Sequence, residues 1–140
     1  MFDHKNIKIE ELQHFLSNTL SEALGMEVVE IGSDFLTIKM PVDRRTVQPY
    51  GLLNGGASMA LAETVASFAG NIYLQNQNKI CVGLEINGNH LRSVRSGWVF
   101  GKATAIHLGK STQVWNIDIT DESGEMVCKS RFTAAVIDKK

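Results

Sequence analysis

One long stretch in the middle of the chain is almost free of charge. Glu63 is the only charged side chain between Arg45 and Lys79. From Gly56 onward the stretch is rich in Ala, Leu and Met and contains no Pro, so its composition predicts a helix that runs to about Gln75. Because this helix is apolar nearly all round, we expect it to lie in the centre of the protein.

The remaining pattern predicts a second, shorter helix and an antiparallel sheet. Apolar residues at helical spacing over 9–24 indicate an amphipathic helix that ends at Gly25. Runs at 26–31 and 35–40 flank a Gly-Ser-Asp turn and predict a hairpin. Further strands are predicted at 79–89, 97–108, 112–120 and 125–137, and short turns favour antiparallel pairing of consecutive strands. The chain is thus expected to be one α+β domain over 1–140, a curved sheet around the central helix.

Composition excludes several classes of function. The chain has 140 residues, 44% of them hydrophobic, which is enough for one core. Fourteen basic and fifteen acidic residues give a net charge of −1, which argues against a nucleic-acid partner. With no signal-like start and no run of about 18 apolar residues, we expect a cytoplasmic protein without a membrane segment. Cys81 and Cys128 are expected to be buried free thiols, and the histidine spacing predicts no metal site.

The neighbours of Glu63 on the helix suggest a binding surface. At helical spacing it is flanked mostly by small residues, namely Met59, Ala60, Ser67 and Gly70. Small neighbours leave room for a ligand or a second chain to approach the carboxylate. An ionised group on an apolar helix is unfavourable unless it is paired or functional. From the residues alone, Glu63 is either a functional acid or a single solvated or ion-paired position.

Two groups of basic residues have two interpretations each. Gly109, Lys110 and Ser111 resemble the end of a phosphate-binding loop, but the spacing to the preceding glycine and the strands on both sides do not fit that motif. They form either a solvated turn or a point of positive charge for a phosphate. His90 and Arg92 follow the end of a predicted strand and are either surface charges or a grip for phosphates. No Gly-x-Ser-x-Gly motif is present.

Three blocks, at 46–64, 82–90 and 107–115, give the chain its resemblance to a known family. Together they resemble the hotdog-fold acyl-CoA thioesterases, especially the branch with hydroxybenzoyl-CoA, dihydroxynaphthoyl-CoA and phenylacetate-type enzymes. The likeness extends from about residue 25 to 137. It implies a curved antiparallel sheet wrapped around the central helix.

The resemblance also implies roles for residues near the start of the central helix. Glu63 matches the carboxylate that attacks the thioester or activates water, and Gly55 matches the glycine whose amide polarises the thioester carbonyl. Gln48 matches a polar residue of the same pocket, and Ser67 a hydroxyl that orients water. Asn54 stands where the family usually has His; an amide can cap the helix or bind substrate, but it cannot shuttle protons.

Substrate and partners follow from the same resemblance. The acyl group is expected to contact Tyr50, Met59 and Phe68, and the coenzyme phosphates to contact His90, Arg92 and the Gly109, Lys110 and Ser111 turn. CoA enters only as part of the substrate, and no other cofactor is expected. The family pocket lies between two subunits, Glu63 coming from one and Gln48 with Gly55 from the other, and dimers commonly form tetramers.

The expected activity is hydrolysis of an aromatic or medium-sized acyl-CoA. Two alternatives remain at this point: a hydroxyacyl-thioester dehydratase on the same fold, and a non-catalytic acyl-CoA-binding protein. The first usually pairs a His with the carboxylate, and the helix contains none. Whether the pathway is quinone synthesis, such as that of menaquinone, or aromatic breakdown is left open.

Overall fold

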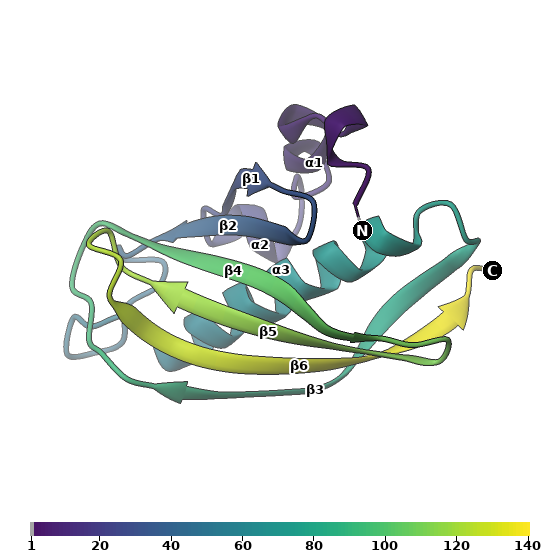
Figure 1. Cartoon of the computed structure of the whole chain (residues 1–140). Coiled ribbons are helices and arrows are strands. Elements are labelled where there is room, and N and C mark those ends of the chain that lie inside the picture. The colour runs from purple at the N-terminus through teal and green to yellow at the C-terminus, as the bar shows by residue number, and fades with distance from the viewer. Residues whose placement is uncertain (1) are drawn as a thin grey trace.

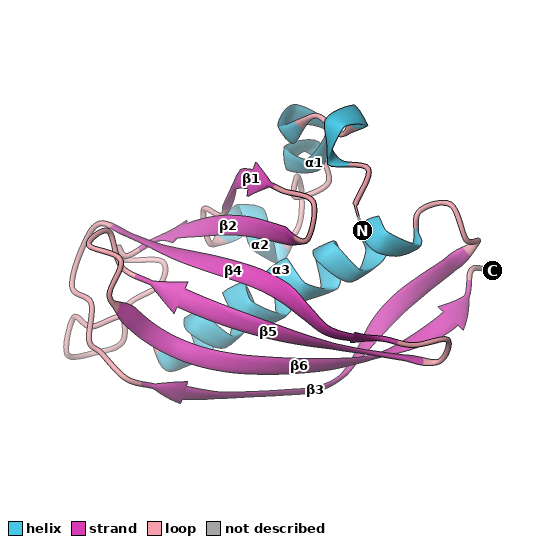
Figure 2. Ribbon diagram, in the orientation of Figure 1, coloured by secondary structure: helices cyan, strands magenta, loops and turns pink. Residues whose placement is uncertain are grey.

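The computed structural model describes residues 2–140. A six-stranded antiparallel sheet curves around one long helix, α3 (Gly55–Leu74) (Figure 1). The strands are β1 (Glu27–Ile31), β2 (Phe35–Pro41), β3 (Lys79–His90), β4 (Trp98–Leu108), β5 (Thr112–Thr120) and β6 (Met126–Asp138). Short helical segments precede them: η1 (His4–Asn6), α1 (Ile9–His14) and α2 (Leu20–Ala23). The predicted α+β architecture is confirmed, and Figure 2 shows how few helical residues lie outside α3.

The start of α3 follows from its capping residue. The Asn54 side chain accepts hydrogen bonds from the backbone N–H groups of Gly56 and Ala57, at 2.7 and 3.3 Å. Such a cap satisfies amides that have no partner within the helix. The predicted N-cap is therefore confirmed. The helix then buries one side against the inner face of the sheet, where Trp115 and Phe132 are fully buried.

Strand order differs from the simplest prediction at one place. The order is β1-β2-β4-β5-β6-β3, so β3 pairs with β6 and not with β4, the next strand along the chain. Pairing of consecutive strands is confirmed for β1–β2, β4–β5 and β5–β6 and is wrong for β3–β4, because β4 pairs with β2 instead. Beyond the end of β3, Leu91 continues the contact by donating its N–H to the Val127 carbonyl at 2.8 Å. Because β3 is the last strand in the sheet order, it is an edge strand.

The expected single N-terminal helix is also wrong, because it divides into α1 and α2. Asn18 has a φ of 60°, which interrupts helical geometry. Thr19 then caps α2: its hydroxyl accepts from the Ser21 N–H at 3.2 Å and donates to the Leu16 carbonyl at 2.5 Å. Phe15, which directly follows α1, is 69% exposed, although its helical spacing suggested a buried residue. Gly25, with a φ of 72°, ends α2 as predicted.

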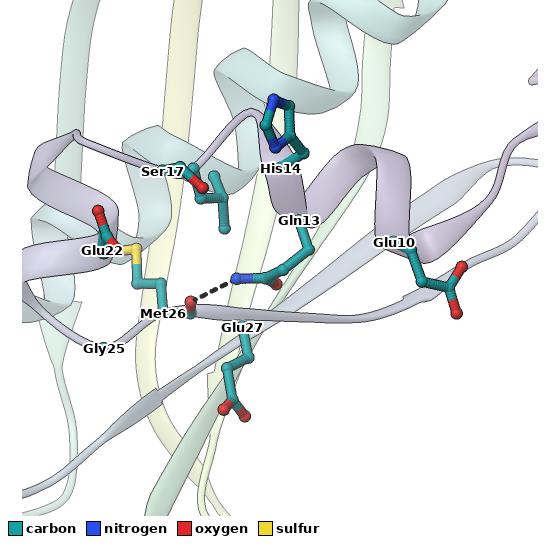
Figure 3. A pocket seen from close by; sticks show the side chains of 9 residues that line it. Glu10, Gln13, His14, Ser17, Glu22, Gly25, Met26 and Glu27 are labelled. Atoms are coloured by element: carbon teal, nitrogen blue, oxygen red, sulfur yellow. Dashed lines mark hydrogen bonds between the residues drawn. The ribbon is translucent and has the colours of Figure 1, made fainter.

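A glutamine attaches α1 to the sheet. Gln13 donates from Nε2 to the Met26 carbonyl at 3.3 Å (Figure 3) and accepts from the Val28 N–H at 2.7 Å. Beside it is an open cavity of about 400 Å³. Figure 3 shows the carboxylates of Glu10, Glu22 and Glu27 pointing away from one another around that cavity. They do not converge on a common point, so this cavity is not our candidate site.

Candidate active site

Glu63 lies on α3 and faces the edge strand β3. The contact is close: a Cβ built on Gly83 would lie 2.5 Å from Glu63 Oε1. Glu63 lines a cavity of about 310 Å³ together with Phe15, Ser67 and Phe68, among others. None of the ion pairs formed among residues 2–140 includes Glu63. The carboxylate is thus half-buried at a cavity and is not held in an ion pair within the described chain.

Aromatic rings form one wall of this cavity. Phe68 and Phe15 pack edge to face, with ring centroids 6.2 Å apart and an interplanar angle of 71°. Both rings also border an adjoining cavity of about 540 Å³ at the end of α3. Phe68 was predicted as an acyl contact, whereas Phe15 belongs to the apolar stripe of the helix predicted over 9–24. The contact of Phe15 with Phe68 joins residues far apart in the sequence, so no local pattern predicts it.

A second group of predicted residues lies at the start of α3. Gln48, Gly55, His90 and Arg92 line a cavity of about 370 Å³. The Gln48 amide oxygen accepts a hydrogen bond from the Tyr50 N–H. His90 Nε2 lies 2.9 Å from the position that a Cβ on Gly55 would occupy. An imidazole therefore stands at the helix start, although the helix itself carries Asn54 where the family usually has His.

These two groups are separated within one chain. Gly55 and Glu63 are eight residues apart on α3, which corresponds to roughly 12 Å along the helix axis. A thioester carbonyl bound at the Gly55 amide would be out of reach of the Glu63 carboxylate of the same chain. One copy of the protein therefore supplies two incomplete halves of the predicted site.

The predicted phosphate contacts are separated as well. His90 is opposite Cys128 at one end of the sheet. The turn containing Gly109, Lys110 and Ser111 joins β4 to β5 at the other end (Figure 1). Thr112, which follows this turn, is opposite Ala135, and Ala135 is opposite Val82. The turn therefore lies level with the start of β3, whereas His90 is at the end of that strand. Consequently, Lys110 does not lie near His90 and Arg92 within one chain.

Two further predicted contacts also lie away from the Glu63 cavity. Tyr50 is 84% exposed on the loop before α3, and its carbonyl accepts from Arg95 Nη1 at 3.5 Å. Met59 packs against β3, where a Cβ on Gly88 would lie 2.5 Å from Met59 Cε. Neither residue lines the cavity of Glu63 in the same chain.

A curved sheet around a helix that carries an isolated carboxylate, with the site divided into two halves, is typical of one class of protein. The model of the thioesterase superfamily matches residues 50–128. The chain belongs to this superfamily of hotdog-fold enzymes and is a thioester hydrolase. Among residues 2–140, no helix has the length and apolar character needed to cross a membrane.

Similar proteins cover nearly the whole chain. The 1,4-dihydroxy-2-naphthoyl-CoA hydrolase of Escherichia coli K12 is 45% identical over 133 residues, which is 95% of this chain and 97% of that protein. The crystal structure of a thioesterase from Haemophilus influenzae is 48% identical, with a TM-score of 0.94, and covers 99% of this chain and 96% of that chain.

Two structures of a thioesterase from Staphylococcus aureus are of substituted proteins. Each is 37% identical to this chain, with TM-scores of 0.80 and 0.81; they cover 84% and 85% of this chain and 97% and 98% of their own. One carries alanine in place of a glutamine, and the other carries alanine in place of a glutamate.

Proposed function

We propose that the protein hydrolyses an aromatic acyl-CoA, of about the size of dihydroxynaphthoyl-CoA, to the free acid and CoA. The observation that carries this proposal is the position of Glu63, unpaired among the described residues and beside the aromatic wall of Phe15 and Phe68. A planar acyl group can stack or pack edge-on against such rings. The similarity to a 1,4-dihydroxy-2-naphthoyl-CoA hydrolase supports the same substrate class.

In this proposal the thioester lies between the two half-sites. The Gly55 N–H, at the positive end of α3, polarises the carbonyl and stabilises the developing oxyanion. Glu63 either attacks the carbonyl carbon and expels the CoA thiolate, or removes a proton from the water that attacks. In the first case, water then hydrolyses the mixed anhydride. In both cases one water is consumed and CoA leaves with a proton on sulfur.

A second copy of the chain brings the halves together. Glu63 lies beside Gly83, near the start of β3, whereas Gly55 lies beside His90 at its end. Antiparallel pairing of two β3 edges about a two-fold axis places the start of one strand near the end of the other. Glu63 of one copy then faces Gly55 and Gln48 of its partner. We therefore propose a homodimer with shared sites, which pairs further into a tetramer.

The spacing of two residues in the Staphylococcus aureus protein supports this pairing of roles. The glutamine and the glutamate that were replaced there are as many positions apart as Gln48 and Glu63 are in this chain. We propose that Gln48 orients the thioester and that Ser67, which lines the Glu63 cavity, orients water. Asn54 supports the Gly55 amide through the helix cap.

The same two-fold arrangement assigns the coenzyme contacts. His90 and Arg92 border the Gly55 cavity of one copy, and the turn of Gly109, Lys110 and Ser111 approaches from the other copy. We propose that these basic groups hold the phosphates at the protein surface. Tyr50 and Met59 are proposed to close the acyl pocket from the partner side, opposite Phe68.

A thiol-release screen tests this function. Naphthoyl-CoA and benzoyl-CoA should give a higher kcat/KM than fatty acyl-CoA, and the same acyl group on acyl carrier protein should react more slowly.

The Phe68→Ala variant should lose most of the preference for aryl groups, because it removes half of the aromatic wall. Hydration of an enoyl thioester without thiol release, or binding without turnover, would contradict the proposal.

A further inference from the structure

Asn71 is a residue of α3 that neither the resemblance nor the proposed chemistry uses. Its side chain bonds to the backbone of β3 in both directions: Nδ2 donates to the Cys81 carbonyl at 3.3 Å, and Oδ1 accepts from the Cys81 N–H at 3.0 Å. Nδ2 also donates to the Ser67 carbonyl at 2.9 Å, one helical turn earlier. The amide therefore connects α3 directly to the edge strand.

The bonded groups of Cys81 face the outer edge of the sheet. Val136, which is opposite Cys81 on β6, sends its N–H the other way, to the Ser111 carbonyl at 2.9 Å. Cys81 and Val136 are therefore a non-hydrogen-bonded pair of the antiparallel ladder. In such a pair each residue directs its N–H and C=O groups away from the other residue, so those of Cys81 point out of the sheet. Asn71 thus satisfies the outward groups of Cys81, so the proposed pairing of two β3 edges does not extend to this residue.

This connection lies close to the proposed catalytic carboxylate. Gly83 follows Cys81 by two residues and lies beside Glu63, because a Cβ built on Gly83 would be 2.5 Å from Glu63 Oε1. The β3–β6 register shifts between Gly83 and Glu85, so the ladder is irregular just after the connection. Cys81 also reaches the helix through its Sγ, 3.5 Å from the Ser67 carbonyl. Asn71 and Cys81 therefore connect α3 to β3 two residues before the place where the strand meets Glu63.

We propose that Asn71 is a positioning residue for the active site: its amide holds the edge of β3 against α3 so that Gly83 keeps the Glu63 carboxylate in its reactive orientation. This proposal rests on the catalytic role proposed for Glu63. Asn71 also lines the Glu63 cavity, but its amide groups are engaged by Ser67 and Cys81, so we expect it to affect the rate of the chemical step more than the binding of CoA. A displacement of about 1 Å in such a site is enough to lower the rate on the order of a hundredfold.

The test combines kinetics with hydrogen exchange. For Asn71→Ala we expect kcat on an aryl-CoA to fall by about ten- to a hundredfold with KM within about twofold of wild type. The Cys81 amide should exchange faster with deuterium, because it has lost its acceptor. Asn71→Asp keeps an acceptor for the Cys81 N–H but turns a carboxylate oxygen toward the Cys81 and Ser67 carbonyls, so repulsion should lower its kcat and its Cys81 protection at least as far as in Asn71→Ala. A melting curve checks that each variant is folded.

Gln77→Ala is the matched control, since Gln77 is an exposed amide just beyond α3 whose side chain bonds to the Tyr73 carbonyl of the same helix, and it should leave kcat and Cys81 exchange unchanged. A folded Asn71→Ala variant with faster Cys81 exchange and wild-type kcat would overturn the positioning role. Unchanged Cys81 exchange would overturn the connection itself. A wild-type protein that releases no thiol from any acyl-CoA would instead overturn the proposed function, and the positioning role with it.

Discussion

Replacing Glu63 with glutamine should lower kcat for an aryl-CoA by about a thousandfold while changing KM little. Glutamine keeps the size of the side chain, and its amide can neither attack a carbonyl nor accept a proton from water at neutral pH. Positioned acid–base groups contribute typically about 10² to 10⁴ in rate, and removal of a group that acts only in the transition state lowers kcat without raising KM. The measurement is steady-state thiol release from naphthoyl-CoA.

Two other substitutions make that result specific. Glu63→Asp keeps a carboxylate but withdraws it by one methylene, so its kcat should lie between those of wild type and Glu63→Gln. Glu30→Gln changes an exposed glutamate on β1, far from α3 in sequence and structure, and should leave kcat unchanged. If Glu63→Gln hydrolysed aryl-CoA at the wild-type rate, the carboxylate would have no part in the reaction.

Replacing Gly55 with proline should lower kcat by about 10² to 10³, the usual loss when one oxyanion donor is removed. Proline has no backbone N–H, so it deletes only the proposed donor. The backbone accepts this change: Gly55 is the first residue of α3, where proline is favoured, and Asn54 has φ −69° and ψ 131°, which suit a residue before proline. Thiol release from the same aryl-CoA is the measurement.

The Gly55→Ala variant is the control for this substitution. Alanine adds the same Cβ, which meets the movable end of the His90 side chain, but it retains the N–H. Its kcat should therefore stay within about tenfold of wild type. Equal losses in Gly55→Ala and Gly55→Pro would assign the effect to displaced His90, and the amide would then have no catalytic part.

Local signals in the sequence were enough to predict most elements. Asn54 is a residue type that caps helices, Gly25 marked the end of α2, and apolar runs bounded by turn residues marked the strands. These features depend on neighbours along the chain, so composition and spacing report them directly. The isolated charge of Glu63 was also visible, because every residue around it in the sequence is uncharged.

Features that depend on distant contacts could not be predicted in this way. The place of β3 at the sheet edge depends on its pairing with β6, many residues later. The meeting of His90 with Gly55, and of Asn71 with Cys81, depends on how α3 lies on that strand. No local pattern records these contacts. The break between α1 and α2 is different, because it is a local feature marked by Asn18 and Thr19 that apolar spacing alone does not predict.

The central claim is that each site combines Glu63 of one copy with Gly55 of another, and mixing two inactive variants tests it most directly. Glu63→Gln and Gly55→Pro are unfolded together, refolded in equal amounts and assayed for thiol release from naphthoyl-CoA. In a mixed dimer one site carries both substitutions and the other carries neither, so random pairing should restore roughly a quarter of wild-type activity. A mixture no more active than the separate variants, although it forms mixed dimers, would show that each chain uses its own Glu63 and Gly55.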